Sequence, residues 1–297
     1  MALVGPTAAG KSAVAMAASR AVGGTEIVVV DSMQVYRGMD IGTAKPTPTE
    51  RAEVRHHGID LVEPSEEFTV TAFQEAGDTA LAEVASRHGR ALLVAGTGLY
   101  LRVLVDALDP PGQWPETRAA IEAEPDTVAL HGRLEQLDPV AAGRMEPTNR
   151  RRVVRALEVT LGSGRPFSSY GPGLGTYPPS DVVQLGLRWP RSDLSRRIEE
   201  RFAGMLDAGL LAEVERLHSA PAPLSRTALQ ALGYQELIDH LDGRTTLEEA
   251  IGRAIIRTRQ LAVRQLRWFQ RDPRIRWVEM PDDADAALTL LVRALEA

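Results

Sequence analysis

The sequence predicts an α/β fold in which a parallel β-sheet is flanked by helices. In the first third of the chain, short buried apolar runs alternate with helical patterns, which is typical of βαβ units. A phosphate-binding loop motif stands between the first of these runs, Ala2–Val4, and a helical run. Residues 110–180 instead show short helices and no β-branched apolar run. We therefore expect a P-loop NTPase-like core with a mostly helical insertion domain.

The phosphate-binding motif reads "GPTAAGKS", a Gly, four residues, then Gly-Lys-Ser. In such a loop, successive backbone N–H groups face an anion at a helix N-terminus, and the helix dipole adds attraction. Lys11 would reach the terminal phosphates, and the Ser12 hydroxyl would complete the shell of a Mg²⁺ ion. The alternative is a glycine-rich turn into a helix, and the motif does not identify the polyphosphorylated ligand. The expected ligand contacts are Gly5, Pro6, Thr7, Ala8, Ala9, Gly10, Lys11 and Ser12.

Apolar runs and amphipathic periodicity predict the remaining elements. The expected strands are Ala2–Val4, Glu26–Val30, Ala91–Gly96, 181–189 and, last, 274–280. The expected helices include 69–88, a long helix within 245–272 that opens with a Thr-x-x-Glu capping pattern, and the tail. A Gly/Pro/Ser-rich segment ends the helical stretch before residue 180. We place the core at residues 1–109 and 181–297 and the insertion domain at residues 110–180.

Bulk composition excludes several classes of protein. A hydrophobic content of 44% and a charged content of 25% are those of an ordinary globular protein. The absence of cysteine excludes disulfides, cysteine-ligated metals and a thiol nucleophile. No apolar run approaches the length of a membrane span, and the start has no signal-peptide pattern. We expect a cytoplasmic protein with no membrane partner.

The distribution of charge points to a nucleic acid although the net charge of −6 does not. Five arginines and one acid lie between residues 144 and 155, and eight arginines and one acid lie between residues 253 and 276. In the second stretch Arg264, Arg267 and Arg271 share one helical face, suited to phosphates. Trp268 beside them is either a core residue or a platform on which a base stacks. A solvated helix face is the alternative for both stretches.

Lysine is used at only two positions, Lys11 and Lys45, among 34 basic side chains. Codon bias explains the scarcity, but it does not explain why both lysines fall in the first 45 residues. Because a compact ammonium differs from a guanidinium in how it binds phosphate, we expect both lysines to contact the phosphorylated ligand.

Two polar residues follow predicted strands, Asp31 after Glu26–Val30 and Thr97 after Ala91–Gly96. With the P-loop they would share the carboxyl edge of the sheet, where open α/β sheets bind ligands. Asp31 could be a Mg²⁺ ligand, a general base or a turn-former, and Thr97 could simply cap a helix. The stretch Asp31–Thr47 is longer than a connector needs, which favours a functional part for it.

A series of motifs recurs in order over nearly the whole chain: "GPTAAGKS", "DSMQVYRGMDIGTAKPT", "GTGLY", "RRVVRALEV", "RIEERFAGML", "GYQEL" and "TRQLAVRQLRWF". Together they resemble the tRNA dimethylallyltransferases (tRNA isopentenyltransferases). The second motif is highly specific for that family, whereas the P-loop is shared by many. The resemblance implies that the P-loop grips the diphosphate of dimethylallyl diphosphate, with Mg²⁺ as cofactor, and does not split ATP. The implied acceptor is the exocyclic amine of adenosine 37, 3′ of the anticodon, in tRNAs reading codons that begin with U.

The resemblance also assigns roles to residues of this sequence. Asp31 is the implied base, Thr97 positions the reacting groups, and Arg201 stabilises the leaving diphosphate. The implied tRNA contacts are Asp31, Ser32, Met33, Gln34, Thr97, Arg118, Arg151, Arg152, Val153, Val154, Arg155, Gly233, Tyr234, Arg264, Arg267 and Trp268. The insertion domain would hold the anticodon stem-loop, and the chain would act as a monomer.

Three other functions remain open from the sequence. An isopentenyltransferase acting on free adenine nucleotides would share the donor site, although the helical insertion and the arginine-rich stretches favour tRNA. A P-loop kinase of a small molecule would also need the Mg²⁺–phosphate grip, but not an arginine-rich C-terminal helix. An RNA-binding protein with a degenerate P-loop is disfavoured by the intact Gly10-Lys11-Ser12 and by Asp31.

Overall fold

The computed structural model describes residues 1–171, 173–280 and 284–296. The chain divides into two compact units, one of Met1–Val105 with Pro179–Ala297 and the other of Asp106–Pro178. We call them the core unit and the inserted unit. Their boundaries lie a few residues before those expected from the sequence.

The core unit is built on a six-stranded sheet in the order β3-β2-β4-β1-β5-β6, and every pairing is parallel. The strands are β1 Ala2–Val4, β2 Thr25–Val30, β3 His56–His57, β4 Arg90–Ala95, β5 Gln184–Arg188 and β6 Ile275–Glu279. In register, Val4 pairs with Ala95, and Ala95 pairs with Val30. The segments that follow β1, β2 and β4 therefore emerge side by side at one edge of the sheet. We call this the carboxyl edge.

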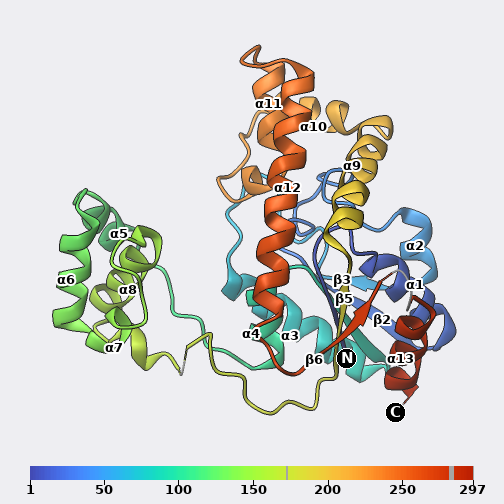
Figure 1. Ribbon diagram of the computed structural model, residues 1–297, viewed down its shortest axis with the longest axis horizontal. Coiled ribbons are helices and arrows are strands. Elements are labelled where there is room, and N and C mark those ends of the chain that lie inside the picture. Colours follow the sequence, from blue (N-terminus) through green and yellow to red (C-terminus); the bar gives the residue numbers. More distant parts are fainter. Residues whose placement is uncertain (172, 281–283, 297) are drawn as a thin grey trace. The chain divides into compact units, whose positions relative to one another are not determined.

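Helices cover both faces of this sheet and extend beyond it (Figure 1). They are α1 Lys11–Ala21, α2 Pro48–Glu53, α3 Val70–Ser86, α4 Gly98–Val105, α9 Arg191–Asp207, α10 Leu210–His218, α11 Tyr234–Leu241, α12 Leu247–Phe269 and α13 Ala284–Glu296. The expected capping pattern of α12 is present, with Thr246 and Glu249 exchanging hydrogen bonds. Helix α12 runs from α11 at one end to α4 at the other. The prediction of a parallel sheet flanked by helices is confirmed.

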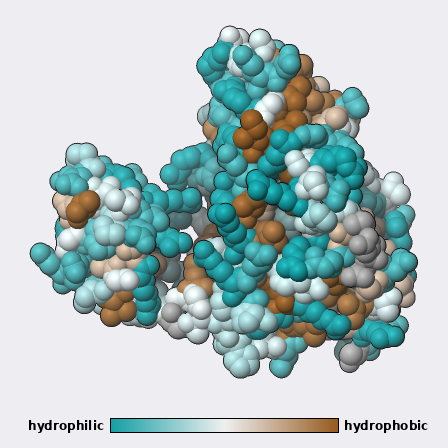
Figure 2. Space-filling view, in the orientation of Figure 1, coloured by the Kyte–Doolittle hydropathy of each residue, from teal (hydrophilic) through white to brown (hydrophobic). Residues whose placement is uncertain are grey.

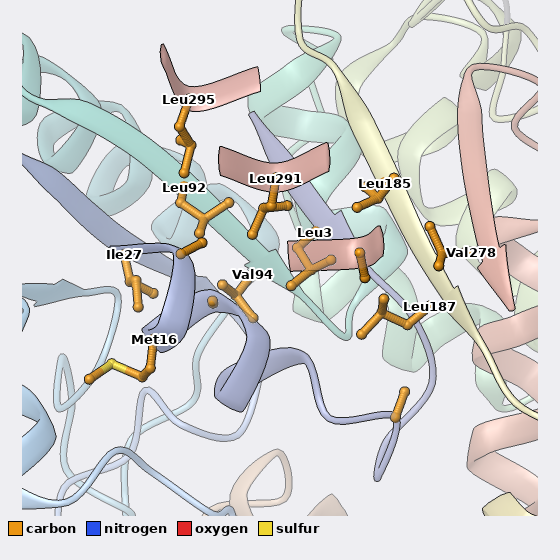
Figure 3. Packing of buried hydrophobic residues seen from close by; sticks show 14 of the residues in the cluster. Leu3, Met16, Ile27, Leu92, Val94, Leu185, Leu187, Val278, Leu291 and Leu295 are labelled. Atoms are coloured by element: carbon orange, nitrogen blue, oxygen red, sulfur yellow. The ribbon is translucent and has the colours of Figure 1, made fainter. Parts of the chain in front are cut away.

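The main core lies between one face of the sheet and helices α1 and α13 (Figure 3). Leu3 of β1 pairs in register with Leu185 of β5, and both side chains point toward Leu291 of α13. All three leucines are buried, and burying each stabilises the fold by about 1.5–3 kcal/mol. This packing fixes the central strands from which the carboxyl-edge segments leave.

The described part of the inserted unit, residues 106–171 and 173–178, contains helices and no strand. Its helices are α5 Pro115–Glu122, α6 Thr127–Leu137, α7 Pro139–Ala142, α8 Arg150–Ser163 and the short η1 Phe167–Ser169. Val153, Val154 and Leu157 of α8 pack with Leu130 and Leu134 of α6 in a small core. Glu158, also buried, accepts hydrogen bonds from the N–H of Trp114 and from Arg118. The unit therefore has its own packed interior.

The surface shown in Figure 2 is largely hydrophilic, with scattered apolar patches. Among the helices that the structure describes, none combines the length and the apolar character needed to cross a bilayer.

Candidate active site

The P-loop adopts a tight turn that only glycine permits at its two ends. A methyl group on Gly5 would lie 3.0 Å from the carbonyl oxygen of Leu187, and Gly10 has a φ of 90°. Gly10 is the N-cap of α1, and the first turn of α1 contains no acidic residue. The positive end of the helix dipole therefore faces outward without a carboxylate from its own turn to neutralise it.

Lys11 folds back over this loop. Its ammonium donates hydrogen bonds to the carbonyl oxygens of Gly5 and Pro6, at 2.9 and 2.8 Å. Burial lowers the pKa of Lys11 to about 8, an effect opposed by the charge of Asp31 and reinforced by that of Arg201. No carboxylate of the described residues forms an ion pair with it. Lys11 is therefore a cation whose neighbouring carbonyls leave its charge available to a bound anion.

Helix α9 turns two arginines toward the P-loop from one face, one helical turn apart. Arg201 donates to the Thr7 hydroxyl at 3.3 Å, and burial lowers its pKa while Asp31 opposes the shift. Arg197 donates to the carbonyl oxygen of Ala8 at 2.8 Å and lies 4.2 Å from the ring centre of Trp189. Arg201 was expected from the sequence and Arg197 was not, although the spacing of four residues places both on the same helical face.

Asp31 follows the end of β2 and lies near the P-loop, close to Lys11 and Arg201. Its Oδ1 accepts a hydrogen bond from the N–H of Met33 at 2.8 Å, which fixes the carboxylate in an Asx turn. Its Oδ2 would lie 3.4 Å from a methyl group on Gly96, at the end of β4. The hydroxyl of Thr97 accepts a hydrogen bond from the N–H of Ser32 at 3.4 Å. The ends of β2 and β4 are thus tied together, and Asp31 lies close enough to Lys11 and Arg201 to influence both pKa values.

Helix α12 contributes two further side chains to the carboxyl edge. Gln265 accepts a hydrogen bond from the N–H of Thr7 at 2.8 Å and donates one to the carbonyl oxygen of Gly96 at 2.9 Å. Trp268 packs so closely on Gly98 that a methyl group there would lie 2.0 Å from its Cδ1. Gln265 was not expected from the sequence. Of the two alternatives for Trp268, a core residue or a stacking platform, the contact with Gly98 favours the first.

Lys45 does not join the P-loop. Its ammonium, whose side chain is 1% exposed, bonds to the carbonyl oxygen of Tyr36 and forms ion pairs with Asp40 and Asp60 at 2.8 and 2.6 Å. Lys45 lies in the Asp31–Thr47 segment, and its three oxygen partners stabilise the conformation of that segment. The expectation that Lys45 contacts the phosphorylated ligand stays a prediction, which these three bonds do not favour.

Three of the expected tRNA contacts have side chains that cannot reach a ligand from outside. Val153 and Val154 are 0% and 1% exposed because they form the core of the inserted unit. Tyr234 is 0% exposed, and its hydroxyl donates to Glu213 at 2.6 Å. Glu213 also accepts hydrogen bonds from the backbone N–H groups of residues 40, 41 and 42. These three side chains hold the fold, and their burial does not favour a side-chain contact with tRNA.

The other expected contacts differ in how accessible they are. Arg118 and Arg155 are partly buried in ion pairs with Glu158, and Gly233 is a buried N-cap of α11. Ser32, Met33 and Gln34 are half-buried just after Asp31. The exposed members are Arg151 and Arg152 in α8 and Arg264 and Arg267 in α12.

A metal ion at this edge would depend on its ligand for most of its shell. No group of three or more His, Asp or Glu side chains close enough to hold a metal occurs within the described ranges. The Ser12 side chain is exposed in the first turn of α1, where a hydroxyl can complete a shell made of phosphate oxygens and water. Mg²⁺ is commonly bound in that way in phosphate sites.

Comparison with known proteins identifies the family. The profile described as IPP transferase matches residues 34–272. A tRNA dimethylallyltransferase of Kineococcus radiotolerans is 45% identical over 100% of this chain and 95% of its own length. One of Geobacter metallireducens is 44% identical over 97% of this chain and 94% of its own length.

Solved structures agree with the sequence relatives. The tRNA isopentenylpyrophosphate transferase of Bacillus halodurans superposes with a TM-score of 0.71 at 36% identity, over 99% of this chain and 96% of that one. A eukaryotic dimethylallyltransferase acting on tRNA superposes with a TM-score of 0.81 at 26% identity, over 98% of this chain and 77% of that one. Identities of this size over nearly the full length leave one conclusion: this chain belongs to the IPP transferase family.

Proposed function

We propose that this chain transfers the dimethylallyl group of dimethylallyl diphosphate to the exocyclic amine, N6, of adenosine 37 in tRNAs that read codons beginning with U. One observation supports this most strongly. A phosphate-binding loop with two cations, Lys11 and Arg201, that form no ion pair with the described residues lies near a carboxylate, Asp31, at the end of β2, one strand further along the sheet. The names of the relatives supply the dimethylallyl group and tRNA, and the resemblance of the motifs implies the diphosphate donor and adenosine 37 as the acceptor.

The leaving group in this reaction is a diphosphate, and its negative charge increases as the bond from carbon to oxygen breaks. The backbone N–H groups at the start of α1, with Lys11 and Arg201, would stabilise that charge at a fixed position. Mg²⁺, held by the Ser12 hydroxyl and phosphate oxygens, would neutralise a further part of the same charge. The loop then serves departure of an intact diphosphate, and no phosphoryl group is transferred.

The acceptor amine is a weak nucleophile because its lone pair is delocalised into the purine ring. As its nitrogen bonds to the allylic carbon it becomes acidic, and a base must accept the proton. Oδ1 of Asp31 is occupied by the N–H of Met33, whereas Oδ2 accepts no hydrogen bond from the residues described. We assign proton acceptance to Oδ2 and the positioning of the amine to Thr97.

Both units offer exposed arginines to the tRNA backbone. Arg151 and Arg152 lie on α8 and Arg264 and Arg267 on α12, and guanidinium groups bind phosphates well. An adenosine must leave its stack before a side chain can reach its amine, so we propose that the target base is flipped into the carboxyl edge. The enzyme would act as a monomer in the cytoplasm, where tRNA is modified.

The deciding experiment is incubation of the protein with labelled dimethylallyl diphosphate, Mg²⁺ and unmodified tRNA, followed by mass spectrometry of the nucleosides. We expect label on adenosine 37, and none on AMP or ATP offered as competing acceptors. Preferential labelling of the free nucleotides would make the chain a nucleotide isopentenyltransferase. Phosphoryl transfer from ATP, with no prenylated product, would make it a kinase.

The role of Asp31 is tested separately by Asp31→Asn, which keeps an oxygen for the Met33 N–H but cannot act as a base at neutral pH. We expect turnover to fall by about 10²–10⁴-fold, the range for a positioned general base, with tRNA affinity unchanged. Asp78→Asn, an exposed position on α3, is the matched control. Normal turnover at saturation, with loss of tRNA binding instead, would contradict the assignment.

A further inference from the structure

Helix α12 contacts the carboxyl edge through two side chains, and one of them joins the segments that follow two strands, β1 and β4. Gln265 and Trp268 are three residues apart and so share a helical face. Trp268 packs on Gly98 after β4, while the amide of Gln265 reaches both the P-loop after β1 and Gly96 after β4. The helix thereby connects the loop that would hold the diphosphate with the segment that carries Thr97.

The two hydrogen bonds restrict which side chain can serve here. The oxygen of the amide accepts from the N–H of Thr7 and the nitrogen donates to the carbonyl of Gly96, so the residue must be acceptor and donor at once. A glutamate cannot donate and a lysine or arginine cannot accept. An asparagine is one methylene shorter. Among residues of this length, glutamine alone satisfies both backbone groups.

The same amide lies next to the reacting groups. A methyl group on Gly96 would lie 3.4 Å from the Nε2 of Gln265 and 3.4 Å from the Oδ2 of Asp31. The amide also occupies the N–H of Thr7, which removes that donor from the set that can face an anion. The remaining N–H groups of the loop and of the first turn of α1 are left for the ligand.

We propose that Gln265 is a positioning residue for the transfer reaction, which sets the separation between the leaving diphosphate and the base. The inference rests on the proposed function, because it concerns the geometry of that reaction. The P-loop would fix the diphosphate, and Asp31 lies close to Gly96. Gln265 joins the P-loop directly to Gly96 through its two hydrogen bonds. A misplacement of about 1 Å between reacting groups can cost about 10²-fold in rate.

The test compares Gln265→Met, Gln265→Glu and Gln260→Met. Methionine has a similar length but makes neither bond. Glutamate can still accept from Thr7, but it loses the donor to Gly96 and adds a negative charge beside the diphosphate. Gln260, exposed on the same helix, carries the same Gln→Met change away from the edge. The measurements are kcat and KM for transfer, the affinity for inorganic pyrophosphate, the affinity for tRNA and the Tm.

We expect Gln265→Met to lower kcat by about 10–100-fold, as for a misplaced reacting group, with tRNA affinity close to that of wild type and a lower Tm, because two backbone groups lose their partner. Gln265→Glu should lower kcat and in addition weaken pyrophosphate binding, by about tenfold or more for a charge added at close range. Gln260→Met should match wild type in all four measurements.

Several results would overturn the inference. One is wild-type kcat per folded molecule in Gln265→Met, which would leave Gln265 a purely structural residue whatever the change in Tm. Another is an equal loss of kcat in Gln260→Met. Unchanged pyrophosphate affinity in Gln265→Glu would remove Gln265 from the diphosphate site. A wild-type protein that transfers nothing to tRNA refutes the proposed function instead, and the pyrophosphate measurements still test the place of Gln265.

Discussion

The P-loop and the segment Asp31–Thr47 each carry one of the two lysines of this protein, and the two ammonium groups differ in their bonding partners. Among the described residues, Lys11 bonds only to the carbonyl oxygens of Gly5 and Pro6. Lys45 is paired with two carboxylates, Asp40 and Asp60, and with one carbonyl. The Lys45 side chain is almost wholly buried and Lys11 is partly buried, but this difference in exposure does not account for their different partners.

The difference lies in the carboxylates, because an ammonium neutralised by two anions has little attraction left for a third. Burial raises the pKa of Asp60, but hydrogen bonds and charge from Lys45 and Arg51 outweigh it and hold that pKa below its ordinary range. The pKa of Lys11 is instead lowered to about 8, mainly by burial. A buried cation without a carboxylate partner is poised to bind an anion, whereas a paired one stabilises the fold.

The largest effect expected from this comparison is that of Lys11→Met on transfer. Removal of one preorganised cation or donor from a developing negative charge costs about 10²–10³-fold in kcat. The Tm should hold or rise, because the substitution removes a desolvated charge. The comparison fails if the variant is unfolded, or if transfer assays show it to be as active as Lys45→Met.

Lys45→Met should show the reverse pattern. It strands the carbonyl of Tyr36 and leaves Arg51 as the remaining ion-pair partner of Asp60, so we expect a loss of about 2–3 kcal/mol in the free energy of unfolding. This lies below the cost of breaking a fully buried pair because Asp40 and Asp60 remain partly exposed. Urea titration gives the loss, and kcat per folded molecule should stay near wild type. A stable but inactive variant would restore Lys45 to the ligand site.

The pH dependence of pyrophosphate binding should show that Lys11 contributes to the affinity and that Lys45 does not. A bound anion raises the pKa of Lys11 above its free value of about 8, so binding takes up a proton once the pH exceeds that value. Affinity contributed by Lys11 is full below about pH 8 and then falls by up to about tenfold per pH unit until the bound pKa is reached. Calorimetric titration between pH 7 and about pH 9.5 measures this.

Lys11→Met should lack this component, and Lys45→Met should keep it. Subtracting the Lys11→Met profile also removes the ionisation of pyrophosphate itself. A wild-type profile parallel to that of Lys11→Met would mean that Lys11 carries no titrating charge in the site.

The smallest expected effect concerns the arginines of α8, which also differ in whether the protein itself already occupies their charge. Arg150 donates to the backbone carbonyls of Glu122, Glu124 and Pro125, while Arg151 and Arg152 are exposed. Replacing Arg151 and Arg152 by alanine should flatten the salt dependence of tRNA binding by up to about one unit of slope per lost phosphate contact. Arg150→Ala should lower stability and change the slope less. An unchanged slope in the double variant would remove α8 from the interface.

The parts of the site that follow from strand order could be predicted from the sequence. A P-loop after one buried strand and polar residues after two others must meet if the strands are parallel neighbours, and the register of Val4, Val30 and Ala95 brings them together. The Thr-x-x-Glu cap of α12 could also be predicted, because it is a pattern within four consecutive residues.

Contacts made by single side chains between segments remote in sequence, other than those that strand order imposes, were not predictable. The bridge made by Gln265 joins two backbone groups, which leave no trace in residue types. The fate of Lys45 depends on Asp60, placed by a loop and by the two-residue strand β3, which is too short for a periodic signal. Val153 and Val154 were assigned by resemblance, although their spacing with Leu157 already marked an inward face.

Arg264 and Gln265 are adjacent in α12, one exposed and the other bonded to the P-loop. A polyanion bound to the exposed side of α12 and a pyrophosphate bound at the P-loop would therefore both act on the position of this one helix. Thermodynamic reciprocity then applies: by whatever factor the outer occupant changes the affinity for the inner one, the inner one changes the affinity for the outer.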